Sequence, residues 1–258
     1  MPRVLLCLVF GLAACTPTPG GPQGDPEALE LVERVRAQHG VGTLDHAEVT
    51  FSFRGTPFTL RRDGTTFRYA RTITDDAGRQ LEEVVDNTGA RRFVDGVEVD
   101  LDEVEADRVM TAVNSVAYFA LLPYSLTDPA VRVRALGPDS IGGQAYDRLE
   151  ATFAQEGGGI DWDDRYVYWL RQPDATMDYL AYSYAVTPGD TSRNETGTRF
   201  REVLGVEEVS GVRFQNYRNL TADSIGPRDL ERFGDLHDVG QTWTISDILL
   251  DSIRVRPL

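Results

Sequence analysis

The stretch FAQEGGGIDWDDRYVYWL, residues 153–170, holds the densest group of residues able to do chemistry in this sequence. Glycines 157–159 could cradle a phosphate, and Asp161, Asp163 and Asp164 could bind a cation. The glycines lack the Lys-Ser/Thr pair of a phosphate-binding loop, and the acids lack the spacing and the distant Glu of an EF-hand. We therefore predict that the stretch is a solvated connection between two strands, with a weak calcium site as the alternative.

Candidate catalytic groups are few. His39, His46 and His237 are the three imidazoles available as bases, and no G-x-S-x-G or H-E-x-x-H motif accompanies them. We assign all three to structural or surface positions, and His39 lies at a predicted helix end where its charge would suit the helix dipole. The sequence predicts no catalytic residue, no metal ligand and no cofactor, so we expect no enzymatic activity. Carboxylates near residues 161–164 leave an envelope hydrolase as an alternative, because catalytic carboxylate pairs meet only in the fold.

The N-terminus has the features of a lipoprotein signal. Residues 1–14 hold one charged residue, Arg3, followed by an apolar run that is too short to span a bilayer. The run ends in LAAC, residues 12–15, which resembles the bacterial lipobox. That resemblance implies lipidation of Cys15 and anchoring of the mature chain by acyl chains such as palmitate. Thr16 follows Cys15, where an inner-membrane retention signal would have Asp. We therefore expect the mature protein to be anchored in the cell envelope, at the outer membrane.

Composition sets the class of the protein. The 258 residues of the full chain are 41% hydrophobic, which is enough for a buried core, and the sequence contains arginine but no lysine. The formal net charge of −15 argues against a nucleic-acid partner, because phosphates would be repelled. Residues 15–24 form a Pro/Gly-rich tether, and residues 25–258 contain no linker or repeat. We therefore predict a single α+β domain over residues 25–258.

Two helices are predicted from their capping residues and apolar spacing. Asp25 supplies an N-cap and Gly40 a C-terminal stop for a helix over residues 26–39. Asp102 caps a second helix, whose later turns are almost wholly apolar before Pro123 ends it. A helix that is apolar all round is buried, so we expect this one to lie across a face of a sheet.

The rest of the chain alternates polar and apolar residues as strands do. Asp63-Gly64 lies between two alternating runs and is a strong hairpin signal. Connections this short join only antiparallel strands, so the first half reads as a long antiparallel meander. In the second half we predict strands over residues 131–136, 144–154, 165–171, 177–186, 199–204, 211–220 and 241–255, and a short helix over residues 227–237.

Several of these strands are apolar on both faces. The segments RYVYWLR and DYLAYSYAV lack the clean alternation of an antiparallel sheet with one wet face. Either other elements cover both faces, or one face lines a cavity. We predict a ligand site lined by aromatic residues, and the alternative is that these residues form the core. The predicted site residues are Tyr118, Tyr168, Trp169, Tyr182 and Tyr184.

Several segments together resemble an uncharacterised family of bacterial lipoproteins, classed as a domain of unknown function; they are RAQHG, VTFSFRG, VNSVAYFALLPYSLTDPAV, FAQEGGG, YVYWL and TMDYLAYSY. The resemblance covers residues 27–217 and implies no activity. More loosely, the lipobox, leading helix, meander and apolar helix are similar to LolA-like and LppX-like lipoprotein carriers. That similarity implies a curved, incomplete β-barrel whose concave face holds acyl chains, with helices as a lid.

We therefore expect a lipid-anchored envelope lipoprotein that binds an apolar ligand or acyl chain in a half-barrel cavity. Its expected partners are the membrane, through the anchor, and a lipid or other apolar small molecule. The alternative is a non-catalytic structural or interaction lipoprotein with a filled core, which would use an exposed loop at residues 187–197.

Overall fold

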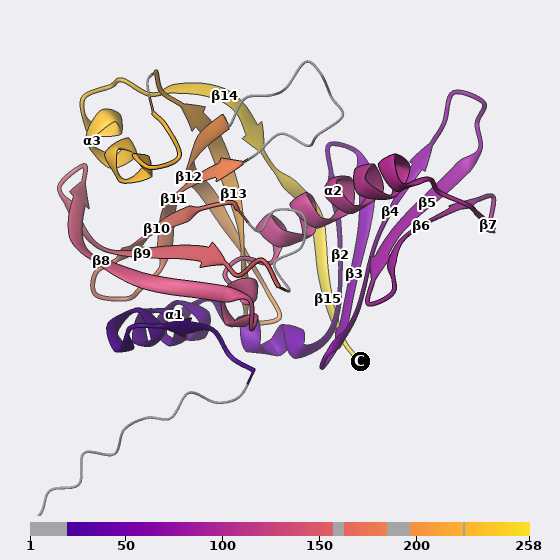
Figure 1. The fold of residues 1–258 in the computed structure, drawn as a ribbon, viewed down its shortest axis with the longest axis horizontal. Coiled ribbons are helices and arrows are strands. Elements are labelled where there is room, and N and C mark those ends of the chain that lie inside the picture. Colours follow the sequence, from indigo (N-terminus) through magenta and orange to yellow (C-terminus); the bar gives the residue numbers. More distant parts are fainter. Residues whose placement is uncertain (1–19, 157–162, 185–196, 224) are drawn as a thin grey trace, which may run out of the picture.

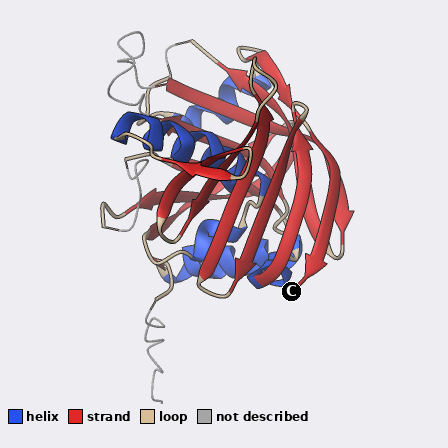
Figure 2. Ribbon diagram, turned by 90° about the vertical axis from the view of Figure 1, so that its right-hand side faces the viewer, coloured by secondary structure: helices blue, strands red, loops and turns tan. Residues whose placement is uncertain are grey.

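The computed structural model describes residues 20–156, 163–184, 197–223 and 225–258 (Figure 1). The described strands form two open sheets, which we name sheet A and sheet B. Sheet A has the order β1-β8-β9-β10-β11-β12-β13-β14, and sheet B has the order β15-β2-β3-β4-β5-β6-β7. Strands make up most of the fold, and the helices lie against the sheets (Figure 2). This agrees with the predicted class, an α+β fold with an incomplete barrel.

The strand bounds follow the turn residues of the sequence. Sheet A consists of β1 (Gln23–Gly24), β8 (Val131–Ile141), β9 (Gln144–Phe153), β10 (Tyr166–Arg171), β11 (Met177–Tyr184), β12 (Gly197–Val209), β13 (Val212–Thr221) and β14 (Trp243–Ile248). Sheet B consists of β2 (His46–Phe53), β3 (Thr56–Asp63), β4 (Thr66–Thr74), β5 (Gln80–Asp86), β6 (Gly89–Val94), β7 (Val97–Val99) and β15 (Leu250–Pro257). The predicted hairpin at Asp63-Gly64 joins β3 to β4, with Gly64 at a φ of 58°.

Two features of the meander differ from the prediction. Residues 241–255, predicted as one strand, are two strands: β14 pairs with β13 in sheet A, and β15 pairs with β2 in sheet B. The chain therefore passes from one sheet to the other at Leu249. At the opposite edge, β1 lies within the predicted tether and pairs in parallel with β8. The pairings of β15 with β2 and of β1 with β8 join residues far apart in the sequence, and local periodicity does not predict such pairings.

Helix α1 (Pro26–His39) has the predicted bounds. The Asp25 side chain accepts a hydrogen bond of 2.9 Å from the Ala28 amide, and Gly40 adopts the left-handed conformation that ends the helix. Its apolar stripe, which includes Val32 and Val35, is buried against sheet A. The predicted cap, stop and stripe of this helix are therefore confirmed.

Helix α2 (Glu103–Ala120) lies across sheet B (Figure 1). Its N-terminus has a capping box, in which Asp102 accepts from the Glu105 amide and Glu105 reaches back to the Asp102 amide. On the helix itself, Val113 and Ala117 are buried on the side that faces sheet B, but Ser115 is exposed on the outer side. The helix is thus buried along one face and not all round. Among the described residues, none of the helices has the length and hydropathy that a membrane span requires.

Sheet A is covered on both faces. Helix α1 and the end of α2 cover one face, where Tyr168, Leu180 and their neighbours are buried. On the other face lie a short helix, η4 (Leu230–Arg232), and α3 (Phe233–Asp238). These two helices replace the single helix predicted over residues 227–237. The double covering explains why strands of this sheet are apolar on both sides.

Candidate ligand-binding site

Four tyrosines on β10 and β11 lie on the same face of sheet A; we call Tyr166, Tyr168, Tyr182 and Tyr184 the tyrosine row. Tyr166 and Tyr182 are paired across the two strands, with ring centroids 5.6 Å apart and planes inclined by 14°. Along each strand the rings continue at 6.2 Å, from Tyr166 to Tyr168, and at 6.1 Å, from Tyr182 to Tyr184. Side chains two residues apart share a face of a strand, so the alternation of the sequence builds this row.

The last turn of α2 meets the tyrosine row. The hydroxyl oxygens of Tyr118 and Tyr168 are 2.9 Å apart, in hydrogen-bond contact. The Tyr118 ring lies 5.2 Å from Tyr166, and the Phe119 ring lies 5.0 Å from Tyr182. We name these two residues and the tyrosine row together the aromatic face. Helix α2 therefore bridges the sheets, because its buried stripe packs on sheet B while its end packs on sheet A.

The aromatic face runs from the core to the surface. Tyr168 has no exposed area and Tyr182 is 9% exposed, whereas Tyr118, Phe119 and Tyr184 remain partly exposed. The ring of Tyr184 lies over Gly197, its register partner on β12, where an added Cβ would be only 2.2 Å from the ring. A glycine is therefore needed at this position to let the ring lie flat at the rim.

The Tyr118 and Tyr168 hydroxyls are neutral at physiological pH. Burial raises the pKa of both Tyr118 and Tyr168 well above the usual tyrosine value. The face therefore presents apolar rings with a few uncharged hydroxyls, which is the usual lining of a site for a largely apolar ligand.

One charged residue enters the aromatic face. Arg201, on β12, is 6% exposed and lies opposite Leu180 of β11. Its guanidinium carbon is 3.4 Å from the centroid of the Phe119 ring, and its Nη2 donates to the Tyr182 hydroxyl at 3.1 Å. Sequence reasoning missed Arg201, Phe119 and Tyr166. Arg201 could have been noticed as a basic residue within a predicted strand, in a sheet whose strands are apolar on both faces.

The structure brings together four of the five predicted ligand-binding residues. Tyr118, Tyr168, Tyr182 and Tyr184 meet on the aromatic face, but Trp169 lies on the opposite face of sheet A. There its Nε1 donates to Asp139 Oδ2 at 2.9 Å, and its ring packs edge-on against Phe200. The predicted lipidation site, Cys15, lies outside the described residues.

The acidic stretch that first suggested chemistry is described only in part. Glycines 157–159 and Asp161 lie outside the described residues. Asp163 is exposed, and Asp164 is buried with its Oδ2 3.4 Å from the Tyr166 hydroxyl. Among residues whose positions are described, no three acidic, histidine or cysteine side chains gather as a metal site would require.

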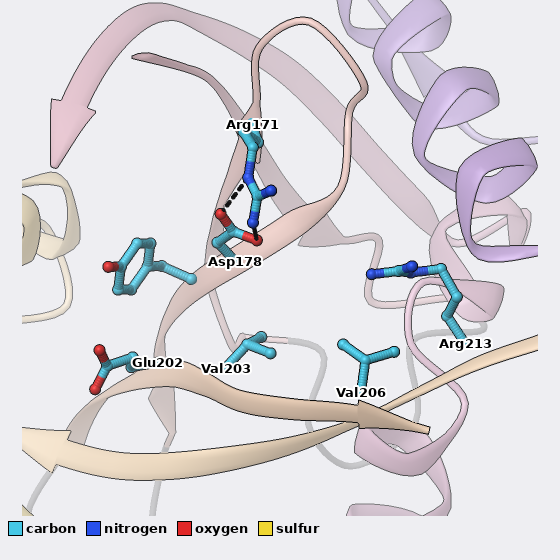
Figure 3. Close-up of a pocket in the computed structure, with 7 residues that line it drawn as sticks. Arg171, Asp178, Glu202, Val203, Val206 and Arg213 are labelled. Atoms are coloured by element: carbon cyan, nitrogen blue, oxygen red, sulfur yellow. Dashed lines mark hydrogen bonds and ion pairs between the residues drawn. The ribbon is translucent and has the colours of Figure 1, made fainter. Parts of the chain in front are cut away.

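A separate polar crevice of about 170 Å³ lies beside β11, β12 and β13 (Figure 3). Arg171 forms a two-pronged ion pair with Asp178 there, at 2.7 and 2.8 Å. Glu202 and Arg213 also line it. The Arg171 charge in this crevice is thus already matched by Asp178.

The fold and site define a β-rich protein with two open sheets bridged by one helix, whose end closes an aromatic face. The chain belongs to a family of unknown function, DUF6503, which it matches over residues 45–244. This confirms the family resemblance predicted from the sequence. No curated protein matches the chain.

Several solved structures are similar to the chain. A DUF1329 family protein from Desulfovibrio piger is 12% identical, with 88% of this chain and 92% of that chain covered and a TM-score of 0.39. The lipoprotein LppX from Mycobacterium tuberculosis is 12% identical, with 62% and 89% covered and a TM-score of 0.27. An outer membrane lipoprotein-sorting protein domain from Vibrio parahaemolyticus is 9% identical, with 89% and 93% covered and a TM-score of 0.34. LppX and the sorting domain belong to the groups named by the looser predicted resemblance.

Proposed function

We propose that this chain is a lipid-anchored protein of the cell envelope that binds an apolar ligand of acyl-chain type on the aromatic face. The observation that carries the proposal is the course of that face, from the buried Tyr168 to the partly exposed Tyr118, Phe119 and Tyr184. A chain of methylene groups laid along these rings would lose contact with water at each step, which is favourable.

The end of α2 acts as the lid in this proposal. Its first turn is held by the capping box and by an ion pair between Arg92 and Glu105 at 3.3 Å. Its last turn instead touches sheet A through Tyr118 and Phe119, whose contacts are aromatic with one hydroxyl pair. Displacing this turn would expose the tyrosine row while the helix remained anchored at its other end.

Binding is tested with the chain expressed from Thr16, which keeps β1 and lacks the anchor. We expect lauric acid to displace the neutral fluorescent probe N-phenylnaphthylamine, and we expect lipid to copurify, as seen by mass spectrometry of an organic extract. A Phe119→Ala variant should bind lauric acid about tenfold more weakly, because it loses most of one aromatic contact surface.

A Trp243→Ala variant is the matched control. Trp243 is 46% exposed on the edge strand β14, which two strands separate from β11, so its removal should leave the affinity unchanged. Absence of both copurifying lipid and probe displacement would overturn the proposed function. Equal weakening by both substitutions would place the binding elsewhere than on the aromatic face.

Anchoring is tested separately through Cys15. Cells that express the full chain should incorporate labelled palmitate into it, and the protein should fractionate with membranes. A Cys15→Ala variant should lose both properties, because it lacks the thiol that the lipid transfer requires. If the variant still carries label and stays with the membrane, Cys15 is not the lipidation site.

A non-catalytic interaction protein with a filled core is the second candidate. It is favoured by the complete burial of Leu149, Tyr168 and Leu180, which fill the centre of this face of sheet A. In that case the aromatic face is only core, and the binding experiment gives a negative result.

A further inference from the structure

Arg201 lies in the core, and no opposite charge from the described part of the chain lies beside it. The side chain is 6% exposed, and no carboxylate of the described residues lies within ion-pair distance of it. Two other partly buried arginines do have such partners: Arg92 pairs with Glu83 at 2.7 Å, and Arg165 pairs with Glu150 at 2.6 Å. A buried charge is normally paired because leaving water is costly for it.

The guanidinium also has hydrogen-bond donors without acceptors. Nη2 donates to the Tyr182 hydroxyl, but Nε and Nη1 are buried and have no acceptor among the residues that the structure describes. Buried polar groups in folded proteins are nearly always satisfied, so Nε and Nη1 are two donors available to an acceptor on a ligand.

Aromatic rings surround the guanidinium. The Phe119 ring lies 3.4 Å from the guanidinium carbon, and the rings of Tyr182 and Tyr217 lie at 5.2 and 5.6 Å. Their π faces attract a cation, and this holds the charge in place. The π faces of these rings supply no lone pairs, so Nε and Nη1 still lack hydrogen-bond acceptors.

We infer that the ligand of the aromatic face is an anionic amphiphile, whose carboxylate head accepts hydrogen bonds from Arg201 Nε and Nη1. The inference rests on the proposed function and deepens it. A carboxylate matches the planar guanidinium, and one negative charge balances one positive charge in a site that excludes water. Phe119 covers the guanidinium in this structure, so its partly exposed ring would move off Arg201 as the head enters and would then pack against the acyl chain. The acyl chain would then lie along the tyrosine row.

The test compares ligands that share one chain and differ in the head. With the chain expressed from Thr16 at pH 8, lauric acid should displace the probe at least about tenfold more effectively than methyl laurate or lauryl alcohol. This comparison needs no variant. Lauryl phosphate distinguishes the two anionic heads: tighter binding of the phosphate would overturn the assignment of a carboxylate.

An Arg201→Met variant should bind the acid and the alcohol equally, and an Arg201→Lys variant should recover part of the preference. The matched control is Arg199→Met on the same face of β12, because Arg199 lies 5.1 Å from the outer ring, Tyr184. It should keep the preference for the acid. Thermal unfolding verifies that each variant is folded.

The outcomes separate the two proposals. Equal binding of acid, ester and alcohol by the unsubstituted chain would overturn the anionic head while leaving the apolar site in place. Failure of all of them to bind would overturn the proposed function itself. A preference for the acid that survives in Arg201→Met would remove Arg201 from the site.

Discussion

A Glu83→Gln variant is expected to have a free energy of unfolding about 3 kcal/mol below that of the wild type, because Arg71 loses its anion and Arg92 keeps only Glu105. The Glu83 side chain is 3% exposed. It accepts from Arg71 Nε at 2.6 Å and from Arg92 Nη2 at 2.7 Å. Removing one partner of a buried pair typically costs about 3–5 kcal/mol, and the lower end applies because both arginines keep some contact with water.

The adjacent residue provides the control. Glu82 pairs with Arg68 at 2.7 Å, but both side chains are about 40% exposed. Glu82→Gln should therefore cost less than about 1 kcal/mol. Urea unfolding of both variants measures the difference. Equal losses would show that burial does not govern the contribution of these ion pairs.

The same ion-pair network bears on the site. Arg92 joins Glu83 to Glu105, so it ties the first turns of α2 to β5 and β6. The last turn of α2 packs on both sheets, because Ala117 and Ala120 are buried in the core of sheet B while Tyr118 and Phe119 contact sheet A. The proposed lid therefore requires this turn to leave part of the sheet B core while the ion pair holds the first turn.

Local signals predicted the elements of this fold well. Asp25 and Gly40 bounded α1, and Asp102 marked the start of α2, because capping depends on a few neighbouring atoms. The division into two sheets was not predictable in this way. It depends on the pairing of β15 with β2, in which Pro257 lies opposite Ala47. The division into two sheets is decided only by contacts between residues that are far apart in the sequence.

The candidate site shows the same division between local and distant information. Alternation along β10 already separates Trp169 from Tyr168, since adjacent residues of a strand point to opposite faces. Applying that rule strictly would have kept Trp169 out of the predicted site. The position of Phe119 over Arg201 could not be predicted, because it depends on how α2 crosses from sheet B to sheet A.

Acid should destabilise the protein through His39. The sequence placed this histidine at the end of α1, where a positive charge suits the helix dipole. The structure buries it completely, and its Nε2 accepts from the Met177 amide at 3.1 Å. Burial is the main cause that lowers the pKa of His39 to about 4, and the charge of Arg213 lowers it further, whereas Asp174 acts in the opposite direction. Desolvation therefore outweighs the dipole.

The sign of the pH dependence follows from this pKa. An unfolded histidine titrates near pH 6.5, so between pH 6.5 and 4 the unfolded chain binds a proton that the folded chain excludes. The contribution of the neutral imidazole is complete above pH 6.5 and is lost as the pH falls towards 4, by about 3 kcal/mol in total. Carboxylates titrate in the lower part of this range, so a comparison with a variant is needed.

His39→Gln isolates the effect, because its side-chain oxygen can still accept from the Met177 amide but does not titrate. Urea unfolding at pH 7, 5.5 and 4.5 should show the wild type losing more stability than His39→Gln as the pH falls. His46→Gln is the control: His46 is exposed beside Asp63, so this variant should follow the wild type. Parallel curves for the wild type and His39→Gln would mean that the folded chain admits a proton at this site. In that case the buried end of α1 must open in acid, because the imidazolium would lose its bond to the Met177 amide.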